Sequence, residues 1–125
     1  MIILDTSVWI EYLKNNQIFF PKISKLLENK EVLAVECVFG ELLQGARGEF
    51  ERDIITEFWK HLPKMHFENI IIEAGVYSAR NKLLDHGVGL IDAIILIHGM
   101  KSTSKIWTLD NKFLKVIPGD LIYAP

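Results

Sequence analysis

Short apolar runs that are continuous, with no alternation in polarity, constrain the fold of this chain more than any other feature. Val32 to Val35 is one such run, and Ile106 and Trp107 lie within another. Continuous runs are typical of strands buried on both faces, as in a parallel sheet packed between helices. The runs predict five short strands, at residues 1–5, 31–36, 64–67, 105–109 and 116–117.

Longer stretches with apolar residues at helical spacing separate these runs. The last of them is apolar on nearly every side and should form the most buried helix. Alternation of strands and helices predicts an α/β fold. We expect a three-layer α/β/α sandwich with a mainly parallel central sheet of about five strands, formed as a single domain by residues 1–125. The predicted helices span residues 7–15, 18–29, 38–47, 50–61, 70–86 and 90–100.

Composition limits the class of protein. Half of the 125 residues are hydrophobic, which predicts a globular chain and excludes a disordered one. No apolar stretch reaches the roughly 20 residues of a membrane span, and no basic segment precedes the N-terminal apolar run. The single Cys37 cannot form an intrachain disulfide. We therefore expect a cytoplasmic protein without a signal peptide or a membrane span.

Four acidic residues border apolar segments that should be buried: Asp5, Glu41, Asp92 and Asp110. Two of them end predicted strands, and two fall near the first turns of predicted helices. In parallel α/β sheets, the carboxyl ends of strands and the N-termini of helices meet at one edge, where ligands bind. The four carboxylates are therefore expected to converge at that edge.

Clustered carboxylates repel one another and need a cation to stay ionised together. Oxygen ligands of this kind suit Mg²⁺ or Mn²⁺, which can promote displacement at phosphorus. Thr6, Ser7 and Thr108 could add hydroxyl contacts to a carboxylate, a metal-bound water or a substrate phosphate. The expected reaction is phosphodiester hydrolysis. Without the four acids, the remaining charge is 14 − 12 = +2, which is compatible with a nucleic-acid substrate.

A simpler interpretation exists for each acid alone. Asp5, Asp92 and Asp110 could each cap a helix, and Glu41 could pair with Arg47 at the surface. The four histidines lack zinc-site spacing, and His98 is expected to be a hydrogen-bonded core residue. The occurrence of all four acids at one predicted edge favours the shared site.

The local contexts of the acids resemble the motifs of PIN-domain ribonucleases, and most of all the VapC toxins of toxin–antitoxin pairs. Residues 3–7 (Ile-Leu-Asp-Thr-Ser) are similar to the first motif, and residues 41–45 (Glu-Leu-Leu-Gln-Gly) to the second. Residues 90–95 (Leu-Ile-Asp-Ala-Ile-Ile) resemble the third motif, and residues 107–113 (Trp-Thr-Leu-Asp-Asn-Lys-Phe) the fourth. Order and spacing match along the whole chain.

This resemblance implies a PIN-like fold and a Mg²⁺- or Mn²⁺-dependent endoribonuclease. Its catalytic metal ligands would be Asp5, Glu41, Asp92 and Asp110. The implied partners are an RNA substrate, a second copy in a homodimer, and a VapB-like antitoxin whose C-terminal segment fills the active site.

The fourth motif departs from the family pattern at one position. Many relatives carry an acid two residues after its Asp, where this chain has Lys112, so a second tightly bound metal is in doubt. Arg47 and Lys112 are possible contacts to substrate or antitoxin. The alternative function is a degenerate PIN-like module that binds a partner without turnover.

Overall fold

The structure, a computed structural model, describes residues 1–125. It contains seven α-helices, two short 3-10 helices and two parallel strands. The prediction of an α/β fold is confirmed. In chain order the elements are β1 (Ile2–Leu4), α1 (Thr6–Leu13), α2 (Phe20–Glu28), α3 (Glu36–Gln44), α4 (Glu49–His61), α5 (Ile70–Arg80), η1 (Leu83–His86), α6 (Leu90–Ser102), β2 (Lys105–Trp107), α7 (Asn111–Leu114) and η2 (Gly119–Leu121).

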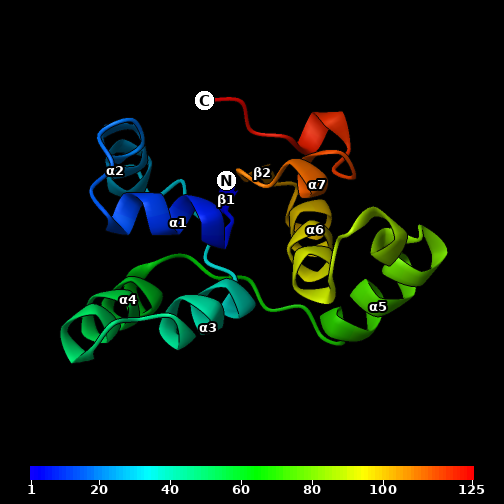
Figure 1. Cartoon of the computed structure of the whole chain (residues 1–125), viewed down its shortest axis with the longest axis horizontal. Coiled ribbons are helices and arrows are strands. Elements are labelled where there is room, and N and C mark those ends of the chain that lie inside the picture. Colours follow the sequence, from blue (N-terminus) through cyan, green and yellow to red (C-terminus); the bar gives the residue numbers. More distant parts are fainter.

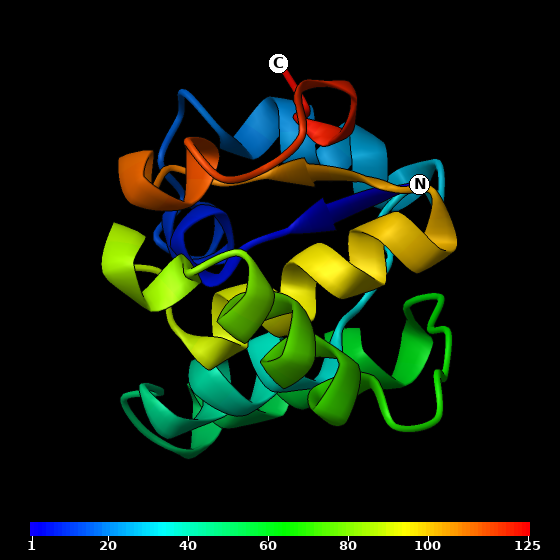
Figure 2. The same cartoon turned by 90° about the vertical axis from the view of Figure 1, so that its right-hand side faces the viewer.

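The two strands lie in the middle of the molecule. Helices α1 and α2 are on one side of them and α5 and α6 on the other, while α3 and α4 form the lower part of Figure 1. Figure 2 shows α6 running beneath β1 and β2. Helices therefore cover the strands from both sides, as the continuous apolar runs require. No helix combines the length and the apolar character needed to cross a membrane.

The sheet is smaller than predicted. Strands β1 and β2 pair in parallel, with Ile3 opposite Ile106. Further pairing is limited to three isolated parallel bridges, Ile2–Val32, Ala34–Lys64 and Ile106–Ile122. Five segments thus contribute to parallel pairing, but only two are long enough to be strands, and the prediction of about five strands is not confirmed.

The predicted strand at residues 116–117 is wrong. Val116 lies in a turn in which its N–H donates to the Phe113 carbonyl at 3.0 Å. Pro118 follows directly and has no N–H to offer to a ladder. Ile122 instead takes the place beside β2, and the Tyr123 N–H donates to the Ile106 carbonyl at 2.9 Å.

The predicted helix at residues 70–86 is two elements. Helix α5 ends at Arg80, and Lys82 adopts a left-handed conformation with φ of 53° before η1 begins. The Asn81 side chain donates to the Tyr77 carbonyl at 2.9 Å, which satisfies a free carbonyl of the last turn. Helix α7 was not predicted, and α3 begins at Glu36, two residues before the expected start.

Helix α6 is the most buried helix, as predicted. All residues from Ala93 to Gly99 are buried. A Cβ atom at Gly99 would lie 2.9 Å from Ile106 Cδ1, so only glycine allows α6 to pack this closely on β2.

His98 is buried, but its Nδ1 has no hydrogen-bond partner, and burial lowers its pKa. The expected hydrogen bond of this core histidine is therefore absent at Nδ1.

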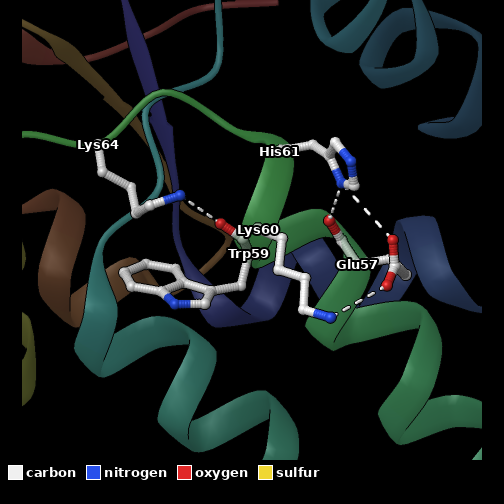
Figure 3. Close-up of polar contacts among 5 residues, drawn as sticks. All are labelled: Glu57, Trp59, Lys60, His61 and Lys64. Carbon is white, nitrogen blue, oxygen red and sulfur yellow. Dashed lines mark hydrogen bonds and ion pairs between the residues drawn. The ribbon is translucent and has the colours of Figure 1, made fainter.

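The end of α4 is held by side chains of its own and the following residues (Figure 3). Lys64 donates to the carbonyls of Trp59 and Leu62, and its ammonium lies 4.7 Å from the Trp59 ring centroid. His61 Nδ1 lies 2.8 Å from the Glu57 carbonyl oxygen. A lysine near a helix C-terminus satisfies free carbonyls and opposes the helix dipole. These contacts hold Lys64 at the position where its backbone forms the isolated parallel β-bridge with Ala34.

Candidate functional site

Asp5 anchors the site at the point where β1 ends and α1 begins. Its backbone N–H donates to the Trp107 carbonyl at 2.9 Å, which fixes it against β2. Its side chain is 5% exposed and accepts hydrogen bonds from Thr6 N–H at 2.8 Å, Ser7 Oγ at 3.1 Å and Thr108 Oγ1 at 2.6 Å. Three donors allow this carboxylate to be buried without an ion pair.

Asp110 lies between the end of β2 and the start of α7. Its carboxylate accepts from the N–H groups of Lys112 at 2.8 Å and Phe113 at 3.3 Å, and so caps α7. Its own N–H donates to Thr108 Oγ1 at 3.1 Å. The same threonine hydroxyl therefore contacts both strand-end acids. Asp5 and Asp110 therefore each cap a helix and also belong to the group of four acids.

Glu41 reaches the site from α3. Its Oε1 accepts from Thr6 Oγ1 at 2.7 Å, which joins α3 to the first residue of α1. The surface ion pair with Arg47 that the simpler interpretation required is not formed. Asp92 lies in the first turn of α6, whose N-cap position is Gly89, so Asp92 is not a cap.

Electrostatics place Asp92 among the other three acids. The pKa of Asp92 is raised from 3.8 to about 6. Burial is the largest cause, and the negative charges of Asp5, Asp110 and Glu41 each raise it further. The structure therefore brings all four predicted acids into one electrostatic neighbourhood at the carboxyl end of the parallel strands.

The acids do not form a closed metal cage. No group of three or more histidine, cysteine, aspartate or glutamate side chains is arranged to hold an ion directly. Hydroxyl and amide donors already contact oxygens of Asp5, Glu41 and Asp110. Mg²⁺ usually keeps several waters and takes only one or two protein carboxylates, so this oxygen donor set fits Mg²⁺ or Mn²⁺ better than a metal needing a full protein cage.

The predicted hydroxyl groups have separate roles. Thr6 donates to Glu41, whereas Ser7 and Thr108 both donate to Asp5 Oδ2. Ser7 Oγ also accepts from the Leu109 N–H at 3.1 Å. Together these hydroxyls link the segments after β1 and β2, over a separation of about a hundred residues, and orient the acids.

A groove of about 750 Å³ runs from the site along α1, α3 and α4. Thr6 and Glu41 line it, and so does Arg47, one of the two predicted contact residues. Arg47 is exposed and its side chain forms no ion pair. Lys112, the other predicted contact residue, is also exposed and follows Asp110 on α7.

Cys37 was missed as a neighbour of the site. Its pKa is raised to about 12 by burial and by the charges of Glu41 and Asp5. The thiol therefore stays protonated, and it is not a nucleophile at neutral pH. The signal was present in the sequence, because Cys37 precedes Glu41 by four residues on the same helix.

Known proteins with similar sequences or folds are found over most of the chain. Ribonuclease VapC32 of Mycobacterium tuberculosis, strains CDC 1551 / Oshkosh and ATCC 25618 / H37Rv, is 28% identical over 116 residues, which cover 90% of this chain and 86% of the relative. A crystal structure of VapBC2 from Rickettsia felis, bound to a DNA fragment from their promoter, contains a chain with the same fold. That chain is 22% identical, with a TM-score of 0.71 over 98% of this chain and 96% of that chain.

The family assignment rests on a third comparison. Residues 2–117 match the PIN domain family, so the match covers nearly the whole chain. The resemblance inferred from the four motifs is thereby confirmed. The chain belongs to the PIN domain family.

Proposed function

We propose that the chain is a VapC-like toxin that hydrolyses RNA phosphodiester bonds with Mg²⁺ or Mn²⁺. The main support is the raised pKa of Asp92, to which burial contributes most and the charges of Asp5, Asp110 and Glu41 add. A relative that matches 90% of the chain is named a ribonuclease. Clustered carboxylates repel one another until a cation binds, and a divalent cation is the ligand that four carboxylates suit.

The four acids would bind the cation directly or through its waters. The cation would neutralise negative charge that develops on the phosphate oxygens. Asp5 would be oriented by Ser7 and Thr108, and Glu41 by Thr6, since these hydroxyls already donate to them. Asp110 would be held by the amides at the start of α7. Each ligand thus has a second contact that limits its rotation.

The proposed regulator is a VapB-like antitoxin. The neighbour from Rickettsia felis is named as a VapBC2 assembly, which supports a partner protein for this chain. The groove beside Glu41 is a suitable place for the antitoxin segment, because it combines apolar walls with Arg47 and Glu51. We also propose a homodimer, in which exposed apolar residues such as Ile71 and Ile72 on α5 would be covered. A toxin that acts on cellular RNA would work in the cytoplasm.

Cleavage of total cellular RNA tests the proposal. Purified protein, free of antitoxin, should produce discrete fragments with Mn²⁺ or Mg²⁺, because the cation completes the acid cluster. Fragments are read by gel or by sequencing of new 5′ ends. EDTA should abolish them, and so should a preparation of the Asp92→Asn variant, which excludes a contaminating nuclease.

An uncut RNA pool from folded protein would contradict the ribonuclease proposal. The alternative would then be a degenerate PIN-like module that binds a partner without turnover. The absence of three acids converging on one point is the observation that favours this alternative. Retained binding of RNA or of an antitoxin peptide without cleavage would support it.

Metal should also stabilise the free protein. A ligand that binds only the native state raises the free energy of unfolding by about 2.7 kcal/mol at a hundred times its Kd. Millimolar Mn²⁺ is therefore expected to raise the Tm by several degrees in thermal denaturation. Ca²⁺-free buffer with EDTA is the reference, and K⁺ at equal ionic strength is the control. An equal effect of K⁺ would show that the shift is general screening of charge.

A further inference from the structure

Lys112 is placed unusually for an exposed lysine. Its side chain lies against Gly87, in the turn between η1 and α6. A Cβ atom built on Gly87 would lie 3.0 Å from Lys112 Cδ and 3.5 Å from Lys112 Nζ. Figure 2 shows α7 next to this segment, at the edge of the molecule. The aliphatic part of Lys112 therefore packs on the glycine backbone.

Gly87 is suited to this contact in two ways. Its φ of +75° lies in the left-handed region that favours glycine. The missing side chain also leaves the room that Lys112 occupies. A side chain here would force the lysine side chain to shift and would strain the turn. The contact lowers the entropy cost of holding the ammonium in one place.

The Lys112 ammonium has no partner within the protein. The three ion pairs of the chain involve other residues, and the only hydrogen bond formed by Lys112 is from its backbone N–H to Asp110. Its backbone N–H contacts the Asp110 carboxylate, and its side chain packs on the turn that precedes α6, the helix of Asp92. Asp110 is two residues before Lys112, and Asp92 follows the turn on which it packs by five residues. A free cation at the border of an acid cluster is available for an anionic ligand.

An RNA backbone is the anion that this arrangement suits. Four carboxylates and one divalent cation leave a net negative charge, so an incoming phosphodiester would be repelled unless another cation lay nearby. Lysine binds phosphate as a compact point charge. We infer that Lys112 binds a backbone phosphate of the RNA substrate beside the acid cluster, and that Gly87 keeps its side chain in position. The inference rests on the proposed ribonuclease function.

Lys112→Met tests the charge while preserving the packing. Methionine keeps an unbranched apolar chain over Gly87 but removes the ammonium. In an Asp92→Asn background, which leaves the RNA uncut, the substitution should weaken binding of a fluorescein-labelled single-stranded RNA by about three- to tenfold in fluorescence anisotropy. The slope of log K against log salt should become less negative by about 0.7, the value for one phosphate contact on a single strand.

Three further variants exclude a purely structural role. Lys112→Arg should retain the slope, because it keeps the charge. Lys22→Ala, an exposed lysine on α2 at the far side of the strands, should change the affinity and the slope little. Gly87→Ala should weaken RNA binding when Lys112 is present but not in the Lys112→Met protein. The strain at Gly87 is the same in both, so only displacement of the charge can produce that difference.

The two proposals fail in different ways. If the Asp92→Asn protein binds RNA and Lys112→Met binds it equally, with the same slope, Lys112 is not a phosphate contact and the ribonuclease proposal is untouched. If the parent binds no RNA and the wild type cuts none, the ribonuclease proposal is wrong, and the role of Lys112 is overturned with it.

Discussion

Asp92→Asn is expected to abolish RNA cleavage and, without divalent cations, to stabilise the fold at neutral pH. Cleavage should fall by at least about a hundredfold, because the amide keeps the volume but cannot supply the negative charge that a hard cation needs. Stability should rise because burial and, after it, the negative charges of Asp5, Asp110 and Glu41 raise the pKa of this carboxylate to about 6. A gain in stability together with a loss of activity is typical of a functional site.

The pH dependence of this effect has a definite sign. The native protein holds a proton on Asp92 up to about pH 6, whereas the unfolded chain releases it near pH 3.8. Between these values the native state binds more protons, so its stability falls as pH rises from about 4 to 6. The pKa difference corresponds to about 3 kcal/mol at most, and solvent screening at this partly exposed group lowers the expected gain to about 1–2 kcal/mol.

Urea denaturation at pH 4 and pH 7, in EDTA, measures this prediction. The variant and the wild type should be equally stable at pH 4 and should separate at pH 7. Asp53→Asn, an exposed aspartate on α4, is the matched control and should show no such separation. Equal stability of wild type and Asp92→Asn at both pH values would mean that the four charges do not meet at Asp92.

The edge of the sheet was predictable in part because Asp5 directly follows a buried run and Asp92 directly precedes one. Asp5 directly follows β1, which pairs in parallel with β2, so its position follows from strand geometry, whereas Asp110 lies beyond the end of β2 as the cap of α7. The burial of α6 followed from its apolar residues on every side. These features depend on local pattern, which a single sequence records well.

Features that depend on distant contacts were not predictable. Residues 116–117 are apolar enough for a strand; Pro118 argues against pairing there, but no local signal identifies Ile122 as the residue that bridges to Ile106. The helix predicted at residues 70–86 is interrupted at Lys82, which adopts a left-handed backbone conformation. Nothing in the local sequence predicts that conformation for a lysine. The Lys112 side chain packs on Gly87, which lies in a separate segment of the chain. The sequence around either residue does not predict this contact.

The same limit applies to the acids themselves. Sequence order placed Glu41 near the site, but its hydrogen bond to Thr6 depends on how α3 packs against α1. The hydroxyl groups were candidates for three kinds of contact, and packing selected the carboxylates. The rotation of each carboxylate side chain decides whether it would hold a cation directly. The hydroxyl groups that donate to the carboxylates fix that rotation.

Asp5→Ala is expected to have the opposite effect on stability from Asp92→Asn, with the same loss of cleavage. Removal of the carboxylate leaves Thr108 Oγ1, which is buried, and the donors of Thr6 and Ser7 without their acceptor. It also removes the cap of α1. Unsatisfied buried donors cost about 1–3 kcal/mol each, and relief of charge repulsion offsets part of this, so a net loss of about 3 kcal/mol is expected.

Two measurements separate the structural part of this effect from the electrostatic part. Urea denaturation gives the loss of stability, and Thr108→Val is the control, because it removes one donor of Asp5 and should cost only about 1 kcal/mol. An NMR titration of the Asp92 carboxyl gives the charge effect. Its pKa should fall from about 6 towards 3.8, since the charge of Asp5 is the first cause after burial. An unchanged pKa of Asp92 in the folded Asp5→Ala protein would contradict the shared electrostatic site, whereas a lowered pKa with lost cleavage would tie the strand-end acid both to the fold and to the chemistry.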